Sequence, residues 1–511
     1  MLRRILLPAL LLVSLAWPAS ATWSILIVNR RTGEVAIGAA TCLPRTNLIK
    51  GLPVVVVGKG AGAIQALSGG ESGLVIMFNG LMNDEDPASI LAAVKLADTR
   101  PNSRQIGISG MTGSPVTFTG TRAQAAKGGV TGEVGDLAYA IQGNVLTGSP
   151  VWFAARDAIL NTPGDMAEKL MASMQAARAM GGDGRCSCDL GRPTRCGSPP
   201  ASFKKSAHCG FMIVARMGDE DATCLTGDDC ANGRYFLKFN IRGSNAEERD
   251  PDPVKQMQGL YDAWRANKIG RPDGLLSTVD PVPAMPADGA TQRTVTVRLV
   301  DIEGTPLTTG GALVEVTPVG AAPVSSVGPV TDNGDGTYSF DVTSGAQPGD
   351  DTYAISADDL SSRKATLFPY LSIRSDPVQP LHVGFDQVSA TASPQVPFVM
   401  NVPGRPGAGY LVVASLNGTQ PGSFLGDLVL PLNAPFVSVL GGVSVLGGGI
   451  DEQRLPGSYG HLDDRGRAEA AFVTGPAVLG PLIGRRIDWA AVVGGRDGRR
   501  ATNAVGFDVV P

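Results

Sequence analysis

The stretch TWSILIVNRRTGEVAIGAAT, residues 22–41, carries the clearest strand pattern of the first domain. Apolar runs at residues 22–29 and 34–40 flank the turn Arg30-Arg31-Thr32-Gly33. Runs of this length, rich in β-branched residues and separated by a turn containing glycine, predict two neighbouring strands. We therefore expect the domain to be built on a hairpin whose first strand begins at Thr22.

The residues before this stretch have the pattern of an export signal. Arg3 and Arg4 are followed by an apolar run over residues 5–17 and by the small-residue cleavage site Ala19-Ser20-Ala21. This run is too short to span a bilayer as a helix, and no later stretch is longer and comparably apolar, so we expect no transmembrane segment. Cleavage after Ala21 would give a secreted or periplasmic protein whose first residue is Thr22.

Composition narrows the class of protein further. The chain has 511 residues, a formal charge of −4, 18% charged residues and 66 glycines, which favours an architecture rich in strands and turns. A mildly acidic chain offers no electrostatic basis for binding nucleic acid. The three histidines lie far apart in sequence and form no pair with metal-ligand spacing, so we expect neither a metal nor another cofactor: His208, His382 and His461.

The seven cysteines predict disulfides. Six of them cluster in a segment near residues 184–230, where we expect up to three disulfides of undetermined connectivity: Cys186, Cys188, Cys196, Cys209, Cys224 and Cys230. The seventh is Cys42. Either Cys42 is unpaired, or one of the disulfides is paired differently from this expectation. Zinc binding is the competing interpretation, but a Cys-x-Cys spacing is not that of a standard zinc finger.

Residues 22–268 alternate strands with helices, which predicts one mixed domain. Further strands are expected at residues 54–57, 105–109 and 116–119, and helices at residues 87–97, 165–180 and 253–267. Residues 269–288 contain four prolines among small residues and are interpreted as a linker.

Two all-β sandwich domains are expected after the linker. Residues 289–378 show strand alternation from Thr294 to Val300 and a turn at residues 332–336 that leads into another strand. This part resembles bacterial immunoglobulin-like modules. The Asp/Asn-Gly cluster of its turn could also hold calcium, although turn chemistry explains it better. Residues 379–511 are interpreted as a second sandwich, and both modules offer surfaces for contacts with partners.

Several motifs of the first domain occur in the order found in one bacterial family. They lie at residues 22–25, 33–34, 40–44, 60–65, 104–107, 119–120, 139–146, 181–183 and 250–254. In this series the chain resembles the domain of unknown function 1028 family, assigned to the N-terminal-nucleophile (Ntn) hydrolase superfamily. The resemblance implies an α+β fold, a four-layer αββα sandwich, with its first residue in a cleft between two sheets. It also implies an amidohydrolase or peptidase whose amide substrate is unknown.

In such an enzyme Thr22 is the nucleophile and its own α-amine is the base. An α-amine has a pKa of about 7.7–8.0, so a useful fraction is unprotonated near neutrality and can accept the hydroxyl proton. Donors for the oxyanion are expected from the Asn144 side chain and the Gly143 amide. The alternative for Asn144 is that its side chain caps a turn.

Five further residues are expected to border the substrate. They are Thr41, Gln65, Arg104, Gln105 and Asp183. Thr41 and Gln65 could instead be satisfied buried polar groups, and Asp183 could be a loop residue. Arg104 and Gln105 could hold a substrate carboxylate, but an internal ion pair between Arg104 and Asp98 is an equal alternative.

Two functional interpretations stay open at this point. The first is a secreted amide hydrolase that uses Thr22. The second is a catalytically inactive Ntn scaffold that serves as a secreted surface or binding protein. Two observations support the second interpretation. Residues 35–40 contain no acid, and neither of the nearby lysines, Lys50 and Lys59, clearly matches a family position.

Overall fold

The computed structural model describes residues 22–67, 70–188, 192–243, 251–360, 364–392, 395–426, 428–436, 453–474, 476–495 and 498–511. The predicted signal peptide, residues 1–21, lies outside the described residues. The chain divides into two compact units, and the first comprises residues up to 276 together with 300–305 and 365–369. Within the described part, no helix has both the length and the apolarity needed to cross a membrane.

Two antiparallel sheets form the centre of the first unit. The larger has the strand order β10 (Leu237–Ile241), β9 (Cys209–Ala215), β2 (Glu34–Thr41), β1 (Thr22–Asn29), β8 (Leu137–Asn144), β7 (Gly128–Val134). The smaller has the order β3 (Pro53–Val56), β4 (Gly60–Gln65), β5 (Gln105–Gly110), β6 (Val116–Thr119). The hairpin predicted from residues 22–41 is thus confirmed, and β1 lies at the middle of the larger sheet.

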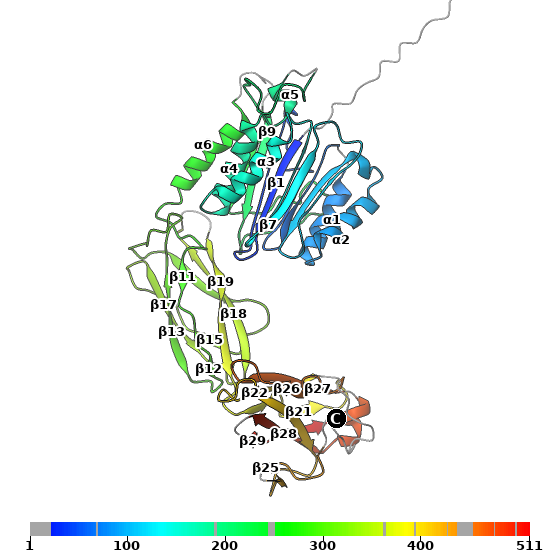
Figure 1. Ribbon diagram of the computed structural model, residues 1–511. Coiled ribbons are helices and arrows are strands. Elements are labelled where there is room, and N and C mark those ends of the chain that lie inside the picture. The colour runs from blue at the N-terminus through cyan, green and yellow to red at the C-terminus, as the bar shows by residue number, and fades with distance from the viewer. Residues whose placement is uncertain are drawn as a thin grey trace, which may run out of the picture. The chain divides into compact units, whose positions relative to one another are not determined.

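Helices cover the outer face of each sheet (Figure 1). The larger sheet carries α3 (Pro150–Asn161), α4 (Met166–Ala179) and α6 (Pro253–Ala266), and the smaller carries α1 (Glu71–Met82) and α2 (Pro87–Ala97). The short helices are η1 (Pro101–Ser103) and α5 (Gly184–Ser187). The predicted strands and helices of this domain are confirmed to within one residue at each end.

The side chains of β1 alternate between two cores. Trp23, Ile25 and Ile27 pack with α3 and α4, whereas Leu26 and Val28 pack between the two sheets. A strand that is buried on both faces is expected to be mostly apolar, which explains why residues 25–28 of β1 are all apolar. Even-numbered residues of β1 therefore face the smaller sheet.

The second unit is all-β. Its first module pairs a sheet of β11 (Thr278–Val279), β13 (Gln292–Arg298), β17 (Thr337–Thr343), β15 (Ser326–Val327) and β16 (Thr331–Asp332) with one of β12 (Met285–Pro286), β19 (Ala365–Asp376), β18 (Gly349–Asp358) and β14 (Leu313–Pro318). Two of these strands, β11 and β12, fall within the predicted linker 269–288. That expectation was wrong for them because β11 pairs with β13, and β12 pairs with β19.

The second module contains three sheets. The first sheet consists of β20 (Leu381–Val383), β22 (Gln395–Asn401) and β27 (Arg467–Val473). The second consists of β21 (Gln387–Ser389), β30 (Val505–Val510), β28 (Arg486–Gly495), β23 (Gly409–Ser415), β26 (Tyr459–His461) and β29 (Gly498–Ala501). The third pairs β24 (Ser423–Leu425) with β25 (Leu428–Leu430). The segments α7 (Pro476–Leu479) and η2 (Gly480–Leu482) complete it. Its core is centred on Trp489, which contacts Phe398 and Phe472. In the described part of residues 289–511 the expected all-β character is confirmed, apart from the short segments α7 and η2.

Candidate functional site

Four polar side chains lie next to one another at one end of the larger sheet. Thr22 of β1 is in register with Asn144 of β8, and Thr41 of β2 is in register with Cys209 of β9. Because Trp23 pairs with Ala40, Thr41 lies across from Thr22. Residues in register share a face of a sheet, and here it is the face toward the smaller sheet. We call Asn144, Thr22, Thr41 and Cys209 the polar row.

The backbone of Thr22 is held by two of the predicted side chains. Its nitrogen donates a hydrogen bond to Asn144 Oδ1 at 3.3 Å, and its carbonyl accepts one from Gln65 Nε2 at 3.0 Å. Thr22 is 3% exposed. The structure thus brings Thr22, Asn144 and Gln65 together, but it uses the amide oxygen of Asn144 as an acceptor rather than showing an N–H aimed at a substrate.

A layer of buried glutamines connects the two sheets below the polar row. Gln65 Nε2 donates to Gln105 Oε1 at 2.9 Å, and Gln105 Nε2 donates to the Gly143 carbonyl at 2.7 Å. Gln142 Nε2 donates to Ser24 Oγ at 2.6 Å. Sequence reasoning missed Gln142 and Ser24. Strand alternation could have identified both residues. Gln142 lies two residues from Asn144, and Ser24 lies two residues from Thr22, so each shares the face of its predicted neighbour.

Gly143 lies inside the larger sheet. It pairs with Trp23 of β1 on one side and with Gly128 of β7 on the other. A Cβ at this position would lie 2.6 Å from Leu146 Cδ1, so packing explains the glycine. Gly143 therefore does not face the polar row, and its position does not support the predicted role of its amide as an oxyanion donor.

Asp183 is fully buried and organises the neighbouring loop. It begins α5 as its N-cap, accepts the Cys42 N–H at 2.7 Å and forms an ion pair with Arg185 at 2.7 Å. Arg185 Nη2 also donates to Thr41 Oγ1 at 3.3 Å. Burial raises the pKa of Asp183, although Arg185 and the Cys42 N–H act against that rise. Arg185, which sequence reasoning missed, therefore links Asp183 to the polar row.

The Arg104 side chain is buried beside the smaller sheet. Its side chain is 1% exposed, and the guanidinium donates to Asp98 Oδ2 at 2.6 Å and to the Leu67 carbonyl. The structure thus uses donors of Arg104 for an internal ion pair, and the substrate-binding role stays a prediction. The alternative left open by the sequence is the one that the structure shows.

The disulfide pairing differs from the expectation in two residues. The bonds join Cys42 to Cys186, Cys188 to Cys196, and Cys224 to Cys230. Cys209 was expected in a disulfide and is instead the unpaired cysteine. The reason is topological: the end of β2 brings Cys42 to α5, whereas the Cys209 thiol donates to the Leu43 and Arg242 carbonyls.

The Cys209 thiol is expected to be unreactive in the native protein. Burial raises its pKa, and the thiolate is the species that attacks a disulfide reagent. We expect no reaction with Ellman's reagent under native conditions and one thiol per chain in guanidinium chloride. Rapid reaction of the native chain, or loss of that thiol in Cys42→Ser rather than in Cys209→Ser, would contradict the assignment.

A buried ion-pair network lies at the opposite end of the larger sheet. Arg216 pairs with Glu34 at 3.0 Å and with Asp273 at 2.7 Å, and its guanidinium lies 3.6 Å from the centre of the Phe236 ring. Burial raises the pKa of Glu34 despite the Arg216 charge beside it. A cavity of about 300 Å³ borders these groups. All of the acids named here already have a cationic partner, so the network has a structural explanation.

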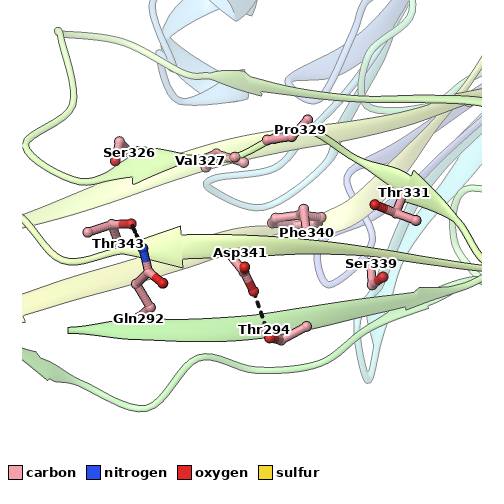
Figure 2. Close-up of a pocket in the computed structure, with 11 residues that line it drawn as sticks. Gln292, Thr294, Ser326, Val327, Pro329, Thr331, Ser339, Phe340, Asp341 and Thr343 are labelled. Atoms are coloured by element: carbon pink, nitrogen blue, oxygen red, sulfur yellow. Dashed lines mark hydrogen bonds between the residues drawn. The ribbon is translucent and has the colours of Figure 1, made fainter. Parts of the chain in front are cut away.

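The first β module carries a polar groove of about 570 Å³ on the sheet formed by β13, β17 and β15 (Figure 2). Thr294 donates to Asp341 at 2.6 Å, and Gln292 donates to Thr343 at 3.2 Å. Dashed lines mark both hydrogen bonds in Figure 2. Hydroxyl, amide and carboxylate groups line the groove, and they offer polar contacts.

Two family models match the chain. Residues 22–189 match a family of unknown function, DUF1028, and residues 275–366 match domain 3 of invasin. Residues 22–189 are therefore similar to the DUF1028 family, and residues 275–366 are similar to an invasin domain. No curated protein matches this chain.

Three solved structures are similar over parts of the chain. A DUF1028 protein from Silicibacter pomeroyi has 19% identity and a TM-score of 0.34, over 48% of this chain and 89% of that one. The Yersinia pseudotuberculosis adhesin InvE has 16% identity and a TM-score of 0.19, over 45% and 58%. The Escherichia coli adhesin FdeC has 10% identity and a TM-score of 0.19, over 80% and 92%.

Proposed function

We propose that this chain is an extracytoplasmic surface protein, in which invasin-type β modules carry the DUF1028 domain and make contacts with partners. The observation that carries this proposal is the match of residues 275–366 to invasin domain 3. The three disulfides support it, because disulfides form and persist in oxidising, extracytoplasmic environments. The apolar residues 5–17, followed by a small-residue cleavage site, supply a route for export.

Protease treatment of intact cells that produce the protein tests this location. We expect the full-length chain to be degraded while a cytoplasmic marker protein stays intact. A matched sample of lysed cells shows that the protease can degrade both. If the chain resists the protease until the cells are opened, the surface location is contradicted.

A second function, hydrolysis of an amide bond by Thr22, is favoured by one specific observation. Thr22 lies at the end of the central strand on the face between the sheets, with its nitrogen against Asn144 Oδ1. The order of layers (helices, larger sheet, smaller sheet, helices) also supports the Ntn-type four-layer sandwich that the resemblance implies.

The chemistry would follow cleavage after Ala21. The freed α-amine takes the proton of the Thr22 hydroxyl as Oγ attacks the substrate carbonyl carbon, and the amide nitrogen leaves with a proton. Water then hydrolyses the resulting ester and restores the hydroxyl. Asn144 Oδ1 would accept an N–H of the amine and orient it, while Gln65 would fix the Thr22 carbonyl.

A further inference from the structure

A group of potential metal ligands lies beside the polar row and takes no part in the chemistry proposed for Thr22. The ligand atoms of Cys42, Cys186 and His208 all lie within 4.8 Å of one another. In the oxidised protein the two cysteines form a disulfide, and their Cα atoms are 5.6 Å apart. The three residues come from the end of β2, from α5 and from the residue before β9.

Backbone hydrogen bonds hold the three segments independently of the sulfur–sulfur bond. The Cys42 N–H donates to Asp183 Oδ2 at 2.7 Å, and the Cys186 N–H donates to the Asp183 carbonyl at 3.0 Å. The His208 N–H donates to the Thr41 carbonyl at 2.8 Å. Opening the disulfide breaks none of these bonds, so the ligands stay close together in the reduced chain.

We propose that reduction of the Cys42–Cys186 disulfide converts this group into a binding site for a thiophilic divalent cation of the zinc type. A dithiol reductant supplies two electrons and two protons to the disulfide and itself closes to a disulfide. A phosphine supplies only the two electrons and becomes a phosphine oxide, while water supplies the two protons and the oxide oxygen. Cation binding then releases the two thiol protons, and His208 binds through an unprotonated ring nitrogen.

The spacing suits tetrahedral coordination. Zinc–sulfur bonds of about 2.3 Å and a zinc–nitrogen bond of about 2.0 Å place the sulfurs about 3.8 Å apart and each about 3.6 Å from the nitrogen. Both separations are below 4.8 Å, the distance within which the three ligand atoms lie of one another. Two thiolates and one imidazole fill three positions, and the fourth is left for water or another ligand.

A second group in the described residues, Cys224, Asp229 and Cys230, is a less suitable site. Its carboxylate already accepts hydrogen bonds from the Thr226 N–H and the Thr223 hydroxyl, both at 3.3 Å. Because all three disulfides open under strong reduction, its cysteines must be removed before the first group can be tested alone.

Cobalt titration of the full-length chain provides the test. In a background with serine at positions 188, 196, 224 and 230, we expect the reduced chain to bind one Co²⁺. It should show the visible bands of tetrahedral cobalt and a thiolate charge-transfer band. We expect the oxidised chain to show neither, and added Zn²⁺ to bleach both.

Two variants in this background identify the ligands. His208→Ala keeps the disulfide in the oxidised state and is expected to weaken cobalt binding at least about tenfold. Cys209→Ser removes the neighbouring thiol and should change nothing. No cobalt bands after reduction, or equal binding by the His208→Ala chain, would overturn the proposal. Circular dichroism of each reduced chain confirms that the comparison is made on folded protein.

Discussion

Replacing Arg216 with alanine is expected to lower the free energy of unfolding of the first unit by about 3–5 kcal/mol. Arg216 is buried and lies between Glu34 and Asp273, which are buried as well. Its removal leaves two carboxylates without their cation and removes the contact with the Phe236 ring. Removing one partner of a buried ion pair costs far more than the pair itself contributes, since the remaining charge stays desolvated.

The matched control is Arg31→Ala. Arg31 pairs with Asp136 at 3.0 Å, but the side chains are 73% and 53% exposed, so we expect a loss below about 1 kcal/mol. Denaturant unfolding of each full-length chain, followed by circular dichroism and tryptophan fluorescence, gives the comparison. Equal losses for Arg31→Ala and Arg216→Ala would contradict the structural role of the network.

The loss in Arg216→Ala is also expected to depend on pH. The pKa of Glu34 is already raised by burial, and removing the Arg216 charge removes an interaction that lowers it. A carboxyl whose pKa is raised in the folded state favours folding when protonated, and that contribution is lost as the pH rises through the folded value. The deficit should therefore be smaller at acidic than at neutral pH.

Replacing Thr22 with alanine is expected to abolish covalent labelling by a β-lactone and to reduce amide hydrolysis by at least about a thousandfold, if the second proposed function holds. The substitution removes the attacking oxygen and leaves the backbone bonds to Asn144 and Gln65 available. Thr22→Ser keeps a hydroxyl on the same residue and should retain labelling.

Two other nucleophiles on the same face provide the controls for Thr22→Ala. Ser24 lies two residues along β1 with its hydroxyl bound by Gln142, and Cys209 belongs to the polar row. Ser24→Ala and Cys209→Ser should both keep the adduct, which peptide mass spectrometry assigns to a residue. An adduct that persists in Thr22→Ala would end the hydrolase proposal. Absence of any adduct in the unsubstituted chain would favour the inactive scaffold.

Local patterns predicted the elements that depend on local sequence. The apolar runs of β1 and β2 and the helical patterns at residues 87–97 and 253–267 were sufficient to locate those elements. The family motifs also placed Thr22, Asn144 and Gln65 in one site, and the structure brings these residues together.

Contacts between distant segments could not be predicted in the same way. The Cys42–Cys186 disulfide joins residues 144 positions apart, and only the approach of α5 to the end of β2 makes it geometrically available. Arg104 has the chemistry of a carboxylate ligand in either role, and its burial beside Asp98 favours the internal ion pair. Arg185 belongs to no motif, and only the folded loop shows its contact with Thr41.

The intact mass of the exported protein tests both proposals at once, because the proposed export signal and the proposed α-amine of Thr22 both require cleavage after Ala21. We expect a mass that corresponds to residues 22–511 with three disulfides, and an N-terminal peptide that begins with Thr22. A chain that keeps residues 1–21, or that begins at any other residue, would contradict the account.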